Sequence, residues 1–85
     1  PWPNPFNPQI TVPFAISKVG RCQVDVYDLR GRRIKGLRSE ELGPGDYKNV
    51  WDGTDLGGRR VSTGAYFVRL LHNDTRQVKK VMLIK

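Results

Sequence analysis

The sequence predicts an all-β fold, an antiparallel β-sandwich of about seven short strands. Apolar and polar residues alternate in several short segments, which is the period-two pattern of half-buried strands. Clusters of Gly, Pro, Asn and Asp separate these segments at intervals of about 8–12 residues, as in small sandwiches. Apolar residues nowhere keep helical spacing for three turns, and the candidate segment 37–42 runs directly into Gly43-Pro44-Gly45.

Length and composition indicate one domain without catalytic or metal chemistry. The 85 residues are enough for one small domain and too few for two. No apolar run approaches the ~20 residues of a membrane span, so no transmembrane segment is expected. One cysteine excludes an internal disulfide framework, and one histidine leaves few routes to a catalytic constellation. We therefore expect no enzyme and no cofactor here, although the parent protein can be an enzyme.

Residues 1–8 are predicted to form a proline-rich extended lead-in or linker, followed by one domain over residues 9–85. Prolines at positions 1, 3, 5 and 8 fix φ and favour extended neighbours, which excludes a helix. The start has none of the features of a leader, so we expect a processed product or a piece of a longer protein. A first strand is predicted over 10–16, and Pro13 places it at a sheet edge because proline donates no ladder hydrogen bond.

The next segments are predicted to form a hairpin. Residues 22–26 alternate apolar with polar side chains, as expected for a strand with one wet face. Residues 28–32 supply the turn, in which Gly31 can take the positive φ of a bulged hairpin. A short strand over 34–37 completes it.

The middle of the chain is dominated by turns. Gly43-Pro44-Gly45 is the strongest turn signal and precedes a strand over 47–51. A long polar turn over 52–58 follows, and a brief seventh strand is expected near Arg60-Val61.

The most hydrophobic segment, 64–72, is predicted to be a central strand. A hairpin connection at 72–75 leads to the last strand, 77–84, in which Val81–Ile84 is apolar on both faces. The predicted core consists of Val24, Val26, Trp51, Tyr66, Val68, Leu70 and Met82.

The polar turn after Trp51 is superficially similar to a calcium loop. Asp52 and Asp55 offer carboxylates, but an EF-hand loop counted from Asp52 would need its closing Glu where Thr63 stands. Asp-Gly and Gly-Gly pairs form turns without any metal, with Asp accepting hydrogen bonds from nearby amides. We interpret the segment as a turn and expect no metal site.

Cys22 and His72 are the only candidates for a nucleophile and its base. Cys22 lies on the predicted apolar face of its strand, where cysteine behaves as a small hydrophobe. A nucleophile needs a base within hydrogen-bond reach, and nothing in the sequence pairs these two residues. We expect a structural cysteine and a solvated histidine.

The net charge of +7 is concentrated in two segments, which raises the question of a charged partner. Residues 18–38 hold seven basic and two acidic side chains. Arginines and lysines on a hairpin protect an exposed strand from aggregation, but they can also bind phosphates or acidic glycans. No aromatic stacking motif of a known RNA-binding module is present, so nucleic-acid binding is not expected.

The final segment, 79–85, allows two interpretations. Lysines flank an apolar run, which fits a last strand with gatekeeping charges. It also fits a chain end that a receptor captures by strand addition. Tyr66 is similarly open, either as a docking residue or as a buried tyrosine whose hydroxyl bonds a neighbouring turn.

A set of short motifs spans nearly the whole chain in a fixed order. They are Pro3-Asn4-Pro5-Phe6-Asn7-Pro8, Val26-Tyr27-Asp28-Leu29-Arg30-Gly31-Arg32, Gly43-Pro44-Gly45, Val50-Trp51-Asp52-Gly53, Gly57-Gly58-Arg59-Arg60-Val61-Ser62-Thr63-Gly64-Ala65-Tyr66-Phe67 and Lys80-Val81-Met82-Leu83-Ile84-Lys85. Each motif alone is weakly specific, but the ordered set resembles type IX secretion system C-terminal sorting domains of the type A group.

This resemblance implies an immunoglobulin-like β-sandwich that directs a larger cargo, carried in N-terminal domains of the same chain, through the periplasm and the outer membrane. The implied partners are the type IX secretion machinery and a sortase-like cysteine peptidase, and the cargo is then released or attached to the cell surface. The implied recognition residues are Gly64, Tyr66, Lys80, Val81, Met82, Leu83, Ile84 and Lys85.

Two alternatives stay open at this point. The chain also resembles the immunoglobulin-like domain of flagellar hook-capping proteins, which usually lacks the proline-rich opening and the terminal lysine. A different class of function is a binding module of an extracellular enzyme or adhesin, using the basic residues of 30–38 for acidic glycans. Salt separates this alternative from strand addition, since electrostatic binding weakens steeply with ionic strength.

Overall fold

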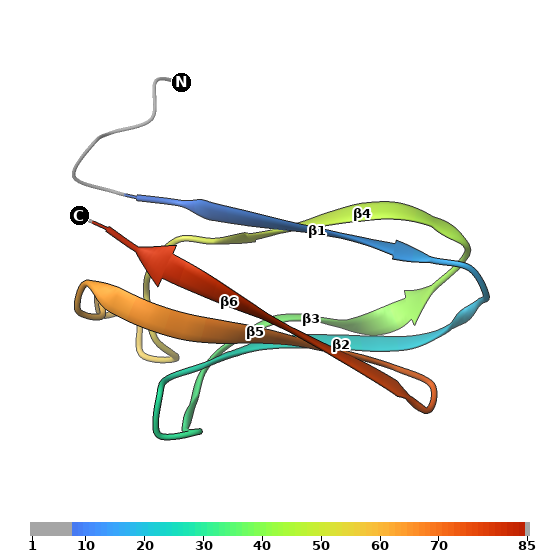
Figure 1. Ribbon diagram of the computed structural model, residues 1–85. Coiled ribbons are helices and arrows are strands. Elements are labelled where there is room, and N and C mark those ends of the chain that lie inside the picture. The colour runs from blue at the N-terminus through green and yellow to red at the C-terminus, as the bar shows by residue number, and fades with distance from the viewer. Residues whose placement is uncertain (1–7, 85) are drawn as a thin grey trace.

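The computed structural model describes residues 8–84 and shows two packed antiparallel β-sheets (Figure 1). β1 pairs with β4 in one sheet, and the other sheet has the order β3-β2-β5-β6. Every secondary-structure element in the described residues is a strand, so the predicted all-β, immunoglobulin-like sandwich is confirmed. Membrane-spanning helices are likewise lacking across residues 8–84. The strands are β1 (Ile10–Ile16), β2 (Gly20–Tyr27), β3 (Arg33–Leu42), β4 (Gly45–Trp51), β5 (Gly64–His72) and β6 (Thr75–Leu83).

The two-stranded sheet follows from alternation in β1 and β4. Val12, Phe14 and Ile16 are buried while the residues between them are exposed. Pro13 lies in β1, whose second side has no strand partner among the described residues, so its predicted edge position is confirmed. The predicted lead-in, residues 1–8, falls almost entirely outside the described residues, and its extended form stays a prediction.

β2 and β3 form the predicted hairpin, but β3 is much longer than the segment 34–37. In the turn, the Asp28 carboxylate accepts hydrogen bonds from the backbone amides of Arg30 and Arg32, both at 2.9 Å. Gly31 has a φ of 82°, as the turn pattern predicts. Two register shifts in the β2–β3 ladder show that β3 is bulged.

The seventh strand expected near Arg60-Val61 does not form. The segment between β4 and β5 contains only an isolated bridge between Thr54 and Arg60. Two local turns hold this segment instead, because the Asp52 and Asp55 carboxylates accept hydrogen bonds from backbone amides two to four residues ahead. Residues 8–84 therefore form six strands, and residues 52–63 cross between the sheets as a loop.

The core between the sheets contains six of the seven predicted residues, and the prediction for Met82 is wrong. Met82 is 54% exposed, whereas Leu83 is fully buried. The register explains the difference, because Leu83 pairs with Gly64 and Val81 with the inward-facing Tyr66. Since side chains alternate along a strand, Met82 must point outward. The buried apolar residues are Val12, Phe14, Ile16, Cys22, Val24, Val26, Leu42, Trp51, Tyr66, Val68, Leu70 and Leu83.

Candidate recognition site at the last strand

β6 lies at the edge of the four-stranded sheet. One of its sides pairs with β5 along its whole length, and the other side has no strand partner within residues 8–84 (Figure 1). An edge strand presents a row of backbone N–H and C=O groups that can pair with an added strand. The region predicted for recognition is therefore placed where strand addition is geometrically possible.

The end of β6 is anchored by Leu83. This side chain is fully buried, and a Cβ on Gly53 would come within 3.3 Å of Leu83 Cδ1. Gly53 also has a φ of 79°, which side chains other than glycine rarely adopt. The Trp-Asp-Gly motif therefore leaves the space in which the last strand is seated. Sequence reasoning treated Gly53 only as a turn former and missed this contact, although its place after a buried tryptophan was the available signal.

Trp51 completes the support beneath the site. Its indole is fully buried, and Nε1 donates a hydrogen bond of 2.9 Å to the Thr54 carbonyl. The indole meets the Tyr66 ring edge to face at 4.9 Å between centroids. Tyr66 in turn pairs with Val81 across the β5–β6 ladder. The loop after β4 and the two strands of the candidate site are thus one packed unit.

Tyr66 is a structural residue of this unit. It is 6% exposed, and its hydroxyl donates a hydrogen bond of 2.7 Å to the carbonyl of Ser62. This is the turn-bonding tyrosine that the sequence offered as one of two interpretations. Gly64, two residues earlier, has a φ of 155°, so the glycine of the Gly-x-Tyr pattern meets a backbone requirement at the start of β5.

The remaining predicted site residues divide by strand face. Lys80 and Met82 are exposed on one face of β6, and Val81 is half-buried on the other. Ile84, just beyond the strand, is 70% exposed. Lys85 lies outside the described residues. The structure thus places Gly64, Tyr66, Val81 and Leu83 together as support, and displays Lys80, Met82 and Ile84 to solvent.

Cys22 and His72 are closer than the sequence suggested, since they are cross-strand partners of β2 and β5. The Cys22 thiol is fully buried and contacts the Gly20 carbonyl at 3.8 Å, while His72 Nε2 lies 2.9 Å from the Lys18 carbonyl. Burial raises the pKa of the Cys22 thiol, which favours the unreactive protonated form. The pair does not have the arrangement of a nucleophile and its base.

The carboxylates of the polar turn accept hydrogen bonds from groups within the same turn. Asp52 accepts hydrogen bonds from the backbone amide and the hydroxyl of Thr54, and these bonds lower the pKa of its carboxyl group. Asp55 accepts from the amides of Gly57 and Arg59 at 2.9 and 3.0 Å. Over residues 8–84, no three His, Cys, Asp or Glu side chains gather as metal ligands.

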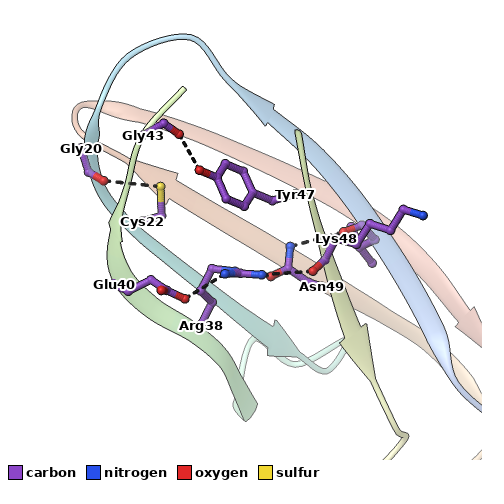
Figure 2. Close-up of polar contacts among 9 residues, drawn as sticks. Gly20, Cys22, Arg38, Glu40, Gly43, Tyr47, Lys48 and Asn49 are labelled. Atoms are coloured by element: carbon purple, nitrogen blue, oxygen red, sulfur yellow. Dashed lines mark hydrogen bonds and ion pairs between the residues drawn. The ribbon is translucent and has the colours of Figure 1, made fainter. Parts of the chain in front are cut away.

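Four of the five basic residues of 30–38 make polar contacts within the fold, although Arg32 and Arg33 keep side chains that are 71% and 47% exposed. Arg38 spans the gap between the sheets, donating to Asn49 at 2.9 Å, to the Lys48 carbonyl at 3.1 Å and to Glu40 at 2.8 Å (Figure 2). The others are Arg32 with Asp28, Arg33 with Asp25, and Lys35 with Thr54 and the Asp55 carbonyl.

The fold and the site define an immunoglobulin-like sandwich that displays an anchored edge strand. The chain belongs to the family described as the secretion system C-terminal sorting domain, whose model matches residues 2–85. No curated protein and no solved structure matched the chain.

Membership of this family establishes the class of function. The domain is a C-terminal sorting signal for type IX secretion, and such signals bring their cargo across the outer membrane to the cell surface or the extracellular space. Domains of this kind are generally non-catalytic. The family match favours the sorting interpretation over the glycan-binding alternative, in agreement with the engaged state of the basic residues.

Proposed function

We propose that the secretion machinery recognises the end of β6 together with the adjoining start of β5, and that the domain itself performs no chemistry. The observation that carries this proposal is the contrast between neighbours: Leu83 is fully buried, whereas Met82 and Ile84 are 54% and 70% exposed. Because the strand is already fixed in place before a partner arrives, binding to its displayed apolar side chains loses little further conformational entropy, which favours binding.

Strand addition is the mode of recognition that fits this geometry. A partner strand along the free side of β6 would gain main-chain hydrogen bonds, and pockets for Met82 and Ile84 would supply specificity. Tyr66 and Gly64 contribute indirectly, because they fix the strand against which β6 is paired. Lys80 and Lys85 would set the register by contacting carboxylates of the partner.

We further propose that a sortase-like cysteine peptidase cleaves the lead-in, residues 1–8. A Cβ on Gly53 would lie 3.3 Å from Leu83 and 3.8 Å from the Pro8 carbonyl, so the chain enters the domain beside the anchored end of β6. A machine that holds this end of the sandwich would lie beside Pro8, where the lead-in joins the domain. Cleavage would then release the cargo or attach it to the surface.

The recognition proposal is tested by charging the displayed side chains. Met82→Asp with Ile84→Asp, in the full cargo protein, is expected to leave cargo in the periplasm while the domain stays folded. Leu56→Asp is the control, because Leu56 is 62% exposed and lies beside Arg33 and Ile34 of β3, at the sheet edge opposite β6. Deletion of residues 81–85 is expected to block export as well. Normal export of both altered cargoes would overturn the proposal.

The cleavage proposal is tested by mass spectrometry of the secreted cargo. Cells that contain the peptidase should yield cargo that lacks this domain, with the new end inside or just before residues 1–8. Cells without the peptidase should retain the full mass. Cargo that keeps the domain in both strains would refute the proposed cleavage.

A further inference from the structure

The outward face of the β5–β6 hairpin has an unusual pattern of side chains. Its ladder pairs one apolar residue with one cation in three successive rows, and it ends in an apolar pair. The rows are Leu71 with Arg76, Arg69 with Val78, Phe67 with Lys80, and Ala65 with Met82. Val78 and Met82 are 52% and 54% exposed. This set of eight residues, which we call the outer hairpin face, contains no acidic side chain.

The neighbouring strand β2 compensates only Arg69 of the outer hairpin face, through Asp25, and leaves Arg76 and Lys80 without a compensating carboxylate from β2. Asp25 lies beside this face but is 1% exposed and forms an ion pair of 3.0 Å with Arg33. Arg69 forms a longer ion pair of 3.8 Å with the same Asp25 carboxylate and stacks over the Tyr27 ring at 4.7 Å. Because Asp25 is buried and shared by two arginines, the exposed part of this face is apolar and cationic, with Arg76 and Lys80 as its cations.

We propose that the outer hairpin face docks onto a protein component of the secretion machinery whose surface places carboxylates between apolar side chains. The inference rests on the proposed function; Lys80 and Met82 of this face also belong to the recognition residues above, whereas Val78, Arg76 and Phe67 do not. Charge complementarity identifies the partner. Because the cations of this face lie in register with apolar residues, a partner with carboxylates spaced between apolar side chains would contact both kinds of residue at once. Arg, Met and Phe are also the side chains enriched in protein interfaces.

The same pattern argues against a membrane as the occupant. Surfaces that enter a bilayer interface separate an apolar side from a charged side. Here Arg76 and Lys80 alternate with the apolar residues, so burying Val78 in lipid would also remove these cations from water. A second copy of the chain is disfavoured too, because two cationic faces and a net charge of +7 on each chain would repel.

The molecule offers a matched control on its opposite sheet. Val50 in β4 is 52% exposed, as Val78 is, and Lys48 is an exposed cation two residues away in the same strand. In the full cargo protein, Val78→Glu and Arg76→Glu are expected to reduce export at least about tenfold, which corresponds to a loss of about 1.4 kcal/mol in binding. Val50→Glu and Lys48→Glu are expected to export normally, with similar unfolding temperatures in all four variants.

Site-specific photo-crosslinking in intact cells identifies the occupant. A crosslinker at position 78 should yield an adduct with a protein of the secretion apparatus, and a crosslinker at position 50 should not. Binding of the cargo to vesicles of anionic phospholipid should be equal for the parent sequence and Val78→Glu. Position-78 adducts with lipid only or with a second copy, or normal export of both Val78→Glu and Arg76→Glu, would overturn the inference. If those variants export normally while deletion of residues 81–85 blocks export, the docking inference fails and the proposed function stands.

Discussion

At the scale of single residues, two tyrosines fasten the turns that precede their strands. Tyr66 donates to the carbonyl of Ser62 and Tyr47 to that of Gly43, both at 2.7 Å and both four residues back along the chain. Each hydroxyl thereby closes the turn that leads into its own strand. The Tyr66 bond lies beside the candidate recognition site and the Tyr47 bond lies far from it. Comparing variants of the two tyrosines therefore distinguishes an effect on stability from an effect on recognition.

Replacing either tyrosine by phenylalanine should cost about 1 kcal/mol of unfolding free energy, since each change removes one hydrogen bond and leaves one carbonyl without its partner. Chemical denaturation of Tyr66→Phe and Tyr47→Phe measures this. Export of the cargo should stay normal for both, because neither hydroxyl is displayed to a partner. Loss of export for Tyr66→Phe alone, at equal stability, would show that the machinery contacts the hydroxyl directly.

Two aspartates couple the stability of the fold to acid pH. Hydrogen bonds from Arg32 lower the pKa of the Asp28 carboxyl, and those from Thr54 lower the pKa of Asp52, both from an ordinary value of 3.8. The folded state therefore binds protons less readily than the unfolded state. Their stabilising effect is complete above the ordinary pKa and is lost as the pH falls through the lowered values.

The unfolding temperature should consequently fall as the pH drops below about 4, where the unfolded chain takes up protons first. The double variant Asp28→Asn and Asp52→Asn should show a flatter dependence, because asparagine keeps an acceptor oxygen but does not titrate. Thermal unfolding followed by circular dichroism across this pH range measures both curves. Equal acid sensitivity of the two proteins would contradict the assigned role of these carboxylates.

At the scale of elements, β6 shows what alternation can and cannot predict. Its existence follows from the apolar run 81–84, but four successive apolar residues leave the phase of the strand undetermined. The pairing of Gly64 with Leu83 settles it, and this pairing depends on the hairpin at Asn73, which has a φ of 51°. Only the tertiary register therefore distinguishes the buried Leu83 from the exposed Met82.

Leu83→Ala should lower the unfolding free energy by about 2–4 kcal/mol, because it leaves a cavity in a fully buried site. Met82→Ala, one position away, should change it by less than about 0.5 kcal/mol, as expected for an exposed side chain. Denaturant titration of the two variants measures the difference. A larger effect of Met82→Ala would mean that the strand is seated with the opposite face inward.

Gly53→Ala tests the link between the loop after β4 and the end of β6. The new Cβ would lie 3.3 Å from Leu83 Cδ1, and the alanine would have to keep the φ of 79° that Gly53 adopts. We expect a loss of about 1–2 kcal/mol from the backbone conformation alone. Gly58→Ala is the control, since it has a similar φ of 81° but no atom within 4 Å of its Cβ. Equal destabilisation of the two variants would contradict a specific contact with Leu83.

The length of β3 and the loop before β5 are two features that the sequence pattern predicts incorrectly. β3 extends to ten residues, although Lys35, Arg38 and Glu40 occupy the positions on its inner side. At a sheet edge these side chains reach past the core, as Arg38 does toward Asn49, so these three positions break the apolar alternation that would have marked the full length of the strand. Conversely, the pattern near Val61 suggested a strand, but the turns at Asp52 and Asp55 satisfy the backbone locally and leave only one bridge.

At the scale of the whole molecule, polar contacts tie the two sheets together along both open sides of the sandwich. Arg38 links β3 to β4 on one side, and Lys79 donates a hydrogen bond of 2.9 Å to the Pro13 carbonyl, which links β6 to β1 on the other. The start of β1 and the end of β6 lie at the same end of the sandwich (Figure 1). Charge composition alone could not reveal this arrangement, because it depends on which cations face inward.

The sorting role depends on the display of a folded edge strand, and transfer of the whole chain to a carrier tests this most directly. A periplasmic reporter fused to residues 1–85 should be found outside the cells of a bacterium with the type IX system, and it should remain in the periplasm of a mutant without that system. A fusion carrying both Met82→Asp and Ile84→Asp, equally folded, should stay in the periplasm. Export of this altered fusion at the rate of the parent, or retention of the parent fusion in cells with an active system, would contradict the sorting role of the displayed strand.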